Sequence, residues 1–281
     1  MNMRLTLVAC LWLSAISATA QGVQVNSETV ETIPSRGEHT QTFILDRVDN
    51  PLATLVLYPG SKGFLGIYPN GSAQFDMFFV YRARKLLAQQ GFNIVLLDAP
   101  SEWGSRGIWE KQRSPEYAAH NAAVIAYARK LADVPVFLMG GSVGAIAATG
   151  VATQLKKNGA DGLILVSPWM PPKDKWPIPN FVFSSDYAIS SWPDLADIKG
   201  PILLVHHLDD NCNFSLPEYV PQLVTALSAS RRPDVAGLRG GVSPSGNACY
   251  PTGWNNFTGM EREVAEVIGD WVRKSIGQGR P

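Results

Sequence analysis

The sequence has few cysteines and histidines, no excess of charge and no long apolar run beyond its first residues. It holds 3 cysteines and 4 histidines among 281 residues, and its 24 basic side chains balance 24 acidic ones. A net charge of zero gives no electrostatic reason to expect a nucleic acid or an anionic membrane as a partner. No apolar run is long enough to span a bilayer. The histidines and cysteines do not stand at metal-ligand spacing, so we predict neither a metal site nor a cofactor.

The N-terminus has the pattern of a signal peptide. Arg4 gives a short positive start, residues 5–16 are apolar, and Ala18-Thr19-Ala20 supplies small residues before Gln21. The alternative is a buried N-terminal helix. We predict a signal peptide over residues 1–20, a mature chain of a single domain over 21–281, and a periplasmic or secreted location.

The cysteine usage agrees with export. Cys10 lies in the predicted signal peptide, which leaves only Cys212 and Cys249. Two cysteines in an oxidising compartment favour one disulfide, and two buried free thiols are the alternative.

Buried strands alternate with amphipathic segments along the chain. Such alternation predicts an α/β protein with a mostly parallel central sheet and helices on both faces. Two weaker strands precede the alternation and suggest an antiparallel start to the sheet. A segment rich in proline and tryptophan, 168–193, is interpreted as a cap-like excursion over the carboxyl edge of the sheet, where ligands bind in such folds. The expected strands are 24–32, 41–46, 53–58, 92–97, 134–139, 163–166, 202–205 and 232–238, and the expected helices are 74–89, 115–132, 143–157, 217–228 and 260–275.

The main chemical motif lies between an expected strand and an expected helix. It reads Gly140-Gly141-Ser142-Val143-Gly144, a GxSxG pattern followed by small, helix-favouring residues. In this context the glycines allow a strained turn that lifts a nucleophilic serine above the sheet. We predict that Ser142 is that nucleophile, although GxSxG also occurs in ordinary glycine turns.

Two further elements suit this motif. After the expected strand 53–58, the turn 59–63 is where an oxyanion-hole donor is expected, and the backbone N–H of Ser61 is the candidate, together with that of Val143. Gly60 or Lys62 is the next choice, and a plain tight turn is the alternative. An acid is expected after a later strand. Asp210 is the better candidate and Asp209 the second, unless either is only a helix cap.

The chain resembles the α/β-hydrolase superfamily over essentially its whole mature length. More narrowly it is similar to a group of small exported serine hydrolases. The matching stretches are Pro59-Gly60, Asp98-Ala99-Pro100-Ser101, Arg113-Ser114, His206-His207 with Asp210 and Cys212, and Cys249 ahead of Phe257-Thr258-Gly259-Met260-Glu261. The resemblance implies that Cys212 and Cys249 form a disulfide and that Asp210 is the acid of a catalytic triad.

The sequence departs from that family at the triad histidine. The family pattern is His-Gly-Phe-x-Gly, and this chain has Asn255-Asn256-Phe257-Thr258-Gly259, with no histidine beyond His207. An amide cannot take up the serine proton at neutral pH as an imidazole does. We therefore predict an exported hydrolase homologue for small carboxylic esters, impaired or inactive because Asn255 replaces the histidine. The rival hypothesis is a non-catalytic ligand-binding protein.

Other residues offer weaker hypotheses. His207 is a possible substitute base, His206 is expected to pack or brace a loop, and His120 to be a hydrogen-bonded helix residue, while nothing assigns chemistry to His39. Arg113 either holds a ligand carboxylate or pairs with a surface acid such as Glu110 or Glu116. The loop tryptophans either line an apolar pocket or form a small core: Trp103, Trp109, Trp169, Trp176, Trp192 and Trp254.

Overall fold

The computed structural model describes residues 25–170 and 188–278 of the chain. The predicted signal peptide and most of the predicted cap-like excursion, with Trp176, lie outside the described residues. Within those two ranges, no helix is long and apolar enough to cross a membrane.

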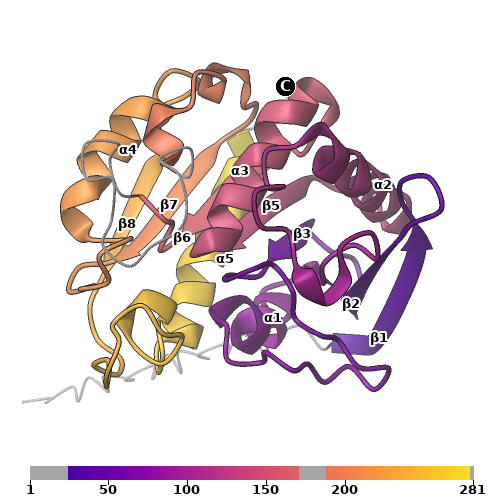
Figure 1. Cartoon of the computed structure of the whole chain (residues 1–281), viewed down its shortest axis with the longest axis horizontal. Helices are drawn as coiled ribbons and strands as arrows, with labels where there is room; N and C mark the ends of the chain where they lie inside the picture. Colours follow the sequence, from indigo (N-terminus) through magenta and orange to yellow (C-terminus); the bar gives the residue numbers. More distant parts are fainter. Residues whose placement is uncertain (1–24, 171–187, 279–281) are drawn as a thin grey trace, which may run out of the picture.

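The described residues form one eight-stranded sheet in the order β1-β2-β4-β3-β5-β6-β7-β8, with β1 and β8 at its two ends (Figure 1). β2 pairs antiparallel with both β1 and β4, and the other pairs are parallel. The predicted fold class and the antiparallel start are confirmed. The strands are β1 (Val25–Pro34), β2 (Thr40–Val48), β3 (Ala53–Tyr58), β4 (Phe92–Leu97), β5 (Val136–Gly141), β6 (Gly162–Val166), β7 (Ile202–His207) and β8 (Asp234–Leu238).

Helices cover both faces of the sheet, and each face has its own hydrophobic core. Every residue of the five central strands β3 to β7 is buried, which explains their continuous apolar sequences. One core contains residues of α2, α3 and α4, and the other contains residues of α1 and α5. The helices are α1 (Phe79–Gln89), α2 (Pro115–Leu131), α3 (Val143–Leu155), α4 (Val220–Leu227) and α5 (Glu261–Gln278).

Several element boundaries differ from the sequence prediction. α1 begins at Phe79 and not at residue 74, because Phe78 has extended backbone angles and the Phe79 N–H bonds to the Asn256 side chain, 3.1 Å away. β5 continues to Gly141 because this glycine pairs with Val166 of β6. The segment 217–219 is a separate 3-10 turn before α4.

A buried ion pair fastens α1 to the antiparallel end of the sheet. The Arg84 guanidinium donates to both carboxylate oxygens of Asp46, at 2.6 and 2.7 Å, and also to Glu28 of β1 at 2.8 Å. The side chains of Arg84 and Asp46 are 4% and 0% exposed. Burial raises the pKa of Asp46, against the opposing effect of Arg84. The pair matters because each charge compensates the other in a dry environment.

A disulfide joins two loops near the carboxyl edge of the sheet. It links Cys212, after β7, to Cys249, 37 residues later. The structure thus contains the pairing that the family resemblance implies.

We expect Arg84→Met to lower the free energy of unfolding by about 3–5 kcal/mol, because the Asp46 carboxylate stays buried without its main cation. Urea denaturation measures this loss. The double variant Asp46→Leu/Arg84→Met should recover most of it, since no buried charge remains. A single variant as stable as the natural sequence would contradict this account.

We expect the oxidised protein to be two hydrogens lighter than the reduced form by intact-mass analysis. Replacing both cysteines by alanine should lower the free energy of unfolding by about 4 kcal/mol, because the unfolded chain regains the entropy of a closed loop. Two alkylatable thiols in the unreduced, denatured protein would show that the bridge is absent.

Candidate active site

Ser142 occupies a strained turn between β5 and α3. Its backbone angles are φ 53° and ψ −121°, a conformation that L-residues rarely adopt. Its N–H donates to the Val166 carbonyl at 2.9 Å, which fastens the turn to β6. A Cβ on Gly144 would lie 2.2 Å from the Tyr58 carbonyl oxygen, and one on Gly140 would lie 2.2 Å from that of Gly144. Both glycines are therefore required, as the GxSxG motif predicts.

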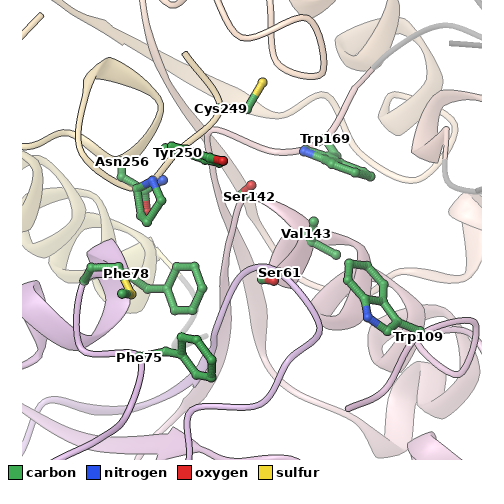
Figure 2. A pocket seen from close by; sticks show the side chains of 12 residues that line it. Ser61, Phe75, Phe78, Trp109, Ser142, Val143, Trp169, Cys249, Tyr250 and Asn256 are labelled. Carbon is green, nitrogen blue, oxygen red and sulfur yellow. The ribbon is translucent and has the colours of Figure 1, made fainter. Parts of the chain in front are cut away.

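The Ser142 side chain faces a pocket of about 440 Å³. Figure 2 shows Ser142 at its centre, with Trp109 and Trp169 on one side and Phe75 and Phe78 on the other. The remaining lining residues are Ser61, Met77, Val143, Cys249, Tyr250, Pro251 and Asn256. Within the described part of the chain, Oγ of Ser142 has no hydrogen-bond partner, so the hydroxyl is available to a ligand.

The turn after β3 lies against the serine turn. A Cβ on Gly60 would sit 3.3 Å from the Gly141 carbonyl oxygen and 3.5 Å from Cβ of Ser142. Ser61 follows with φ 53° and lines the same pocket as Ser142 and Val143. Val143 is the first residue of α3, and such N–H groups have no partner inside the helix. This arrangement suits two backbone donors beside the serine, one from each turn.

Lys62 and Asp98 hold the remainder of that turn. The Lys62 carbonyl accepts the Ile108 N–H at 2.8 Å, and its ammonium donates to the Ser105 carbonyl at 2.6 Å, so Lys62 faces the segment after β4. The Asp98 carboxylate accepts the N–H groups of Leu65, Gly66 and Ile67 at 2.8–3.3 Å. The sequence identified Asp98 only through the family resemblance. Only the structure shows that its carboxylate holds three backbone N–H groups.

Asp210 lies buried beneath the site, whereas Asp209 is at the surface. Asp209 pairs with Arg239 at 3.1 Å, and its side chain is 41% exposed. Asp210 is 4% exposed, and its Oδ1 accepts the Cys212 N–H at 2.9 Å. Its Oδ2 accepts the Ser215 hydroxyl at 2.8 Å and Nδ2 of Asn255 at 3.0 Å. Burial raises the pKa of Asp210, while these three hydrogen bonds oppose that effect.

Asn255 therefore contacts the carboxylate that a triad histidine would contact. Its Nδ2 also donates to the Ser215 hydroxyl, and its Oδ1 accepts Nδ2 of Asn256 at 3.3 Å. Asn255 is 2% exposed and does not line the pocket, whereas Asn256 does. A chain of hydrogen bonds thus runs from Asp210 through Asn255 to the pocket wall. The sequence reasoning did not identify Ser215, because a serine five residues after an aspartate forms no motif.

His207 makes two hydrogen bonds that leave neither ring nitrogen available. Nδ1 accepts the Asp209 N–H at 3.1 Å, and Nε2 lies 3.0 Å from the Gly240 carbonyl oxygen. The first bond uses a lone pair on Nδ1, and the second suits a proton on Nε2. The ring also stacks on Trp254 with centroids 5.5 Å apart. His207 is buried, and it is not among the residues that line the pocket with Ser142.

The other residues considered from sequence serve packing roles. His120 bonds through its two nitrogens to Ser35 at 2.7 Å and to Glu102 at 2.9 Å. Nδ1 of His206 is buried and has no partner among the described residues, and burial lowers the pKa of this ring. Among residues 25–170 and 188–278, no cluster of three or more histidine, cysteine, aspartate or glutamate side chains could hold a metal ion.

The tryptophans divide between the two alternatives, and Arg113 pairs with an acid of the chain, although not one of the two named as examples. Trp109 and Trp169 line the pocket. Trp192, by contrast, lies under the Arg113 guanidinium, 4.2 Å from it. Arg113 pairs with Asp194 at 3.2 Å and not with the two glutamates expected from sequence. The ion pair joins segments 81 residues apart, which local sequence cannot indicate.

Comparison with known proteins identifies the fold. No family model matches the chain, and no curated protein matches it by sequence. Solved structures do match. A sugar hydrolase from Lactococcus lactis is 17% identical with a TM-score of 0.59, and the match covers 89% of this chain and 99% of that one. Carboxyl esterase 2 from the fungus Tuber melanosporum is 12% identical with a TM-score of 0.60, over 92% and 89% of the two chains.

A third similar structure is an alpha-beta serine hydrolase homologue from Coxiella burnetii, 16% identical with a TM-score of 0.55, over 90% of this chain and 98% of that one. At these identities the likeness concerns the fold. Together with the eight-stranded, mostly parallel sheet and the helices on both of its faces, these matches show that the chain has the α/β-hydrolase fold.

Proposed function

We propose that this chain is an exported serine-hydrolase homologue that binds small carboxylic esters and lacks the base needed for efficient turnover. The observation that carries the proposal is the 3.0 Å contact between Asn255 and Asp210 next to the strained Ser142 turn. The proposal assigns the acid to Asp210, the nucleophile to Ser142 and the oxyanion donors to the N–H groups of Ser61 and Val143. The side chain that is hydrogen-bonded to the acid is an amide.

The chemistry follows from these groups. Ser142 would attack the ester carbonyl to form an acyl-enzyme, and the N–H groups of Ser61 and Val143 would bind the developing oxyanion. The hydroxyl proton has no acceptor, because an amide is not basic at neutral pH. In well-studied serine proteases, losing a triad member costs about 10⁴- to 10⁶-fold, and roughly 10³- to 10⁴-fold acceleration over water remains. Slow turnover is therefore expected.

Export is supported by two features of the sequence and fold. Residues 1–20 have the pattern of a signal peptide, and the disulfide between Cys212 and Cys249 suits an oxidising compartment. We place the mature protein in the periplasm or outside the cell.

The second candidate function is non-catalytic ligand binding. A specific observation favours it: Asp210 has its hydrogen bonds satisfied by Cys212, Ser215 and Asn255 without any imidazole. The network is complete as it stands, which is what a site selected only for binding would show. Chemical reactivity of Ser142 separates the two functions.

We expect Ser142 to react slowly with a fluorophosphonate probe, because no base removes its proton. The measurement is the labelling rate of the natural sequence beside that of an esterase with a complete triad, with Ser142→Ala as the blank. Labelling as fast as the complete esterase would mean that another base acts on Ser142, and the impaired-hydrolase proposal would fall.

We expect Asn255→His to raise hydrolysis of a short-chain p-nitrophenyl ester at least about 100-fold. Asp210 would orient the new ring through one nitrogen and leave the other facing Ser142. The gain should vanish in the double variant with Ser142→Ala. It should also fall below about pH 6, because the protonated ring cannot accept the serine proton.

Asn255→Gln is the matched control, since it changes the side chain without adding a base and should give no gain. If Asn255→His folds and adds no Ser142-dependent activity, esters are not turned over in this pocket. The ligand-binding function would then be the better account.

A further inference from the structure

The pocket beside Ser142 is lined by uncharged residues throughout its described part. Aromatic rings from four separate segments make most of its wall: Phe75, Phe78, Trp109, Trp169 and Tyr250. Trp169 is itself held by stacking on Phe214, with centroids 4.3 Å apart. Such a wall suits a flat apolar or aromatic group. At about 440 Å³ the pocket lies within the range of small-molecule sites and leaves room for one ring system with small substituents.

Two charged side chains close to this wall, Arg82 and Asp210, have partners among the described residues. Arg82 pairs with Glu261 at 2.8 Å, and its remaining N–H groups donate to the carbonyls of Asn256, Met77 and Pro251. Arg82 therefore binds the backbone of three lining residues and does not itself line the pocket. Asp210 lies behind Asn255, to which it is hydrogen-bonded. Within the described lining, a charged ligand would therefore lose its hydration and meet N–H donors but no full opposite charge, which is costly.

Besides hydroxyl groups, which can donate or accept, the lining offers hydrogen-bond donors. Oδ1 of Asn256 accepts the Phe79 N–H at 3.1 Å, so the amide nitrogen must point away from α1. One of its two hydrogens goes to Oδ1 of Asn255 at 3.3 Å, and the second remains for the pocket that Asn256 lines. The N–H groups of Ser61 and Val143 add two further donors. These N–H groups favour a ligand that carries a hydrogen-bond acceptor.

We propose that the pocket selects an uncharged aromatic carbonyl compound, an aryl ester or amide, and that Asn256 is a ligand-binding residue that donates to its acceptor. The inference rests on the proposed function only in using the same pocket. It requires binding and no turnover.

Three compounds of nearly equal shape test the charge requirement: benzamide, benzoate and benzamidine, which are neutral, anionic and cationic. Titration of the natural sequence, followed by tryptophan fluorescence or calorimetry, should show benzamide binding at least about tenfold more tightly than either ion. For a ligand of this size we expect a Kd of about 10 mM or below. Benzoate binding as tightly as benzamide, or no binding of benzamide in this range, would overturn the proposal.

The variant Asn256→Asp tests the donor. A carboxylate oxygen can still accept the Phe79 N–H, so α1 keeps its cap, but the N–H facing the pocket is lost and a negative charge is added. Benzamide affinity should fall about tenfold, and benzamidine should become the preferred compound. Unchanged selectivity in a folded variant, checked by circular dichroism, would contradict the role of Asn256.

Asn247→Asp is the matched control for the added charge. Asn247 is exposed, and its Oδ1 likewise accepts a backbone N–H, that of Cys249 at 2.9 Å, but it does not line the pocket. Its substitution should leave the order of the three affinities unchanged. This binding experiment is independent of the Asn255→His experiment. If Asn255→His adds no ester hydrolysis, the ester-hydrolysis proposal fails, but the natural sequence should still prefer benzamide.

Discussion

The close packing of the serine turn against two neighbouring strands is the constraint on which the site depends. Gly144 passes the end of β3 so closely that any side chain would collide with the Tyr58 carbonyl. The Ser142 N–H is bonded to Val166 of β6 on the other side. Held from both sides, the turn keeps Ser142 in a strained backbone conformation above the sheet. The oxyanion turn and the pocket walls are arranged around this one fixed position.

The acid side of the site is held together by a second set of contacts. The disulfide from Cys212 to Cys249 ties the loop after β7 to the loop that leads to Asn255. Asp210 is buried there, and a buried carboxylate without partners would be strongly unfavourable. Ser215 and Asn255 supply those partners in the absence of an imidazole. The buried carboxylate therefore has its hydrogen bonds satisfied by the described residues without an imidazole.

The amides at positions 255 and 256 bear both on the proposed recognition and on the proposed catalysis. Asn255 connects Asp210 to Asn256, and Asn256 connects the pocket wall to the first N–H of α1. Each amide uses its oxygen within the protein, and Asn256 retains one N–H for the pocket. Together with the aromatic wall this favours a neutral acceptor as ligand. Chemistry and selectivity thus depend on the same hydrogen-bonded chain.

The sequence by itself determined the sheet and the serine turn, because both depend on local patterns. Continuous apolar runs indicate strands buried on both faces, and the two glycines around Ser142 indicate a turn that only glycine permits. The antiparallel start and the absence of a histidine at position 255 were also evident. Only the tertiary structure buried Asp210 and left Asp209 at the surface, brought Ser215 to Asp210, engaged both nitrogens of His207 and placed Asn256 in the pocket wall. The physical reason is that each of these outcomes depends on where a side chain points after folding. The contact of Asn256 with Phe79, for example, joins residues 177 positions apart.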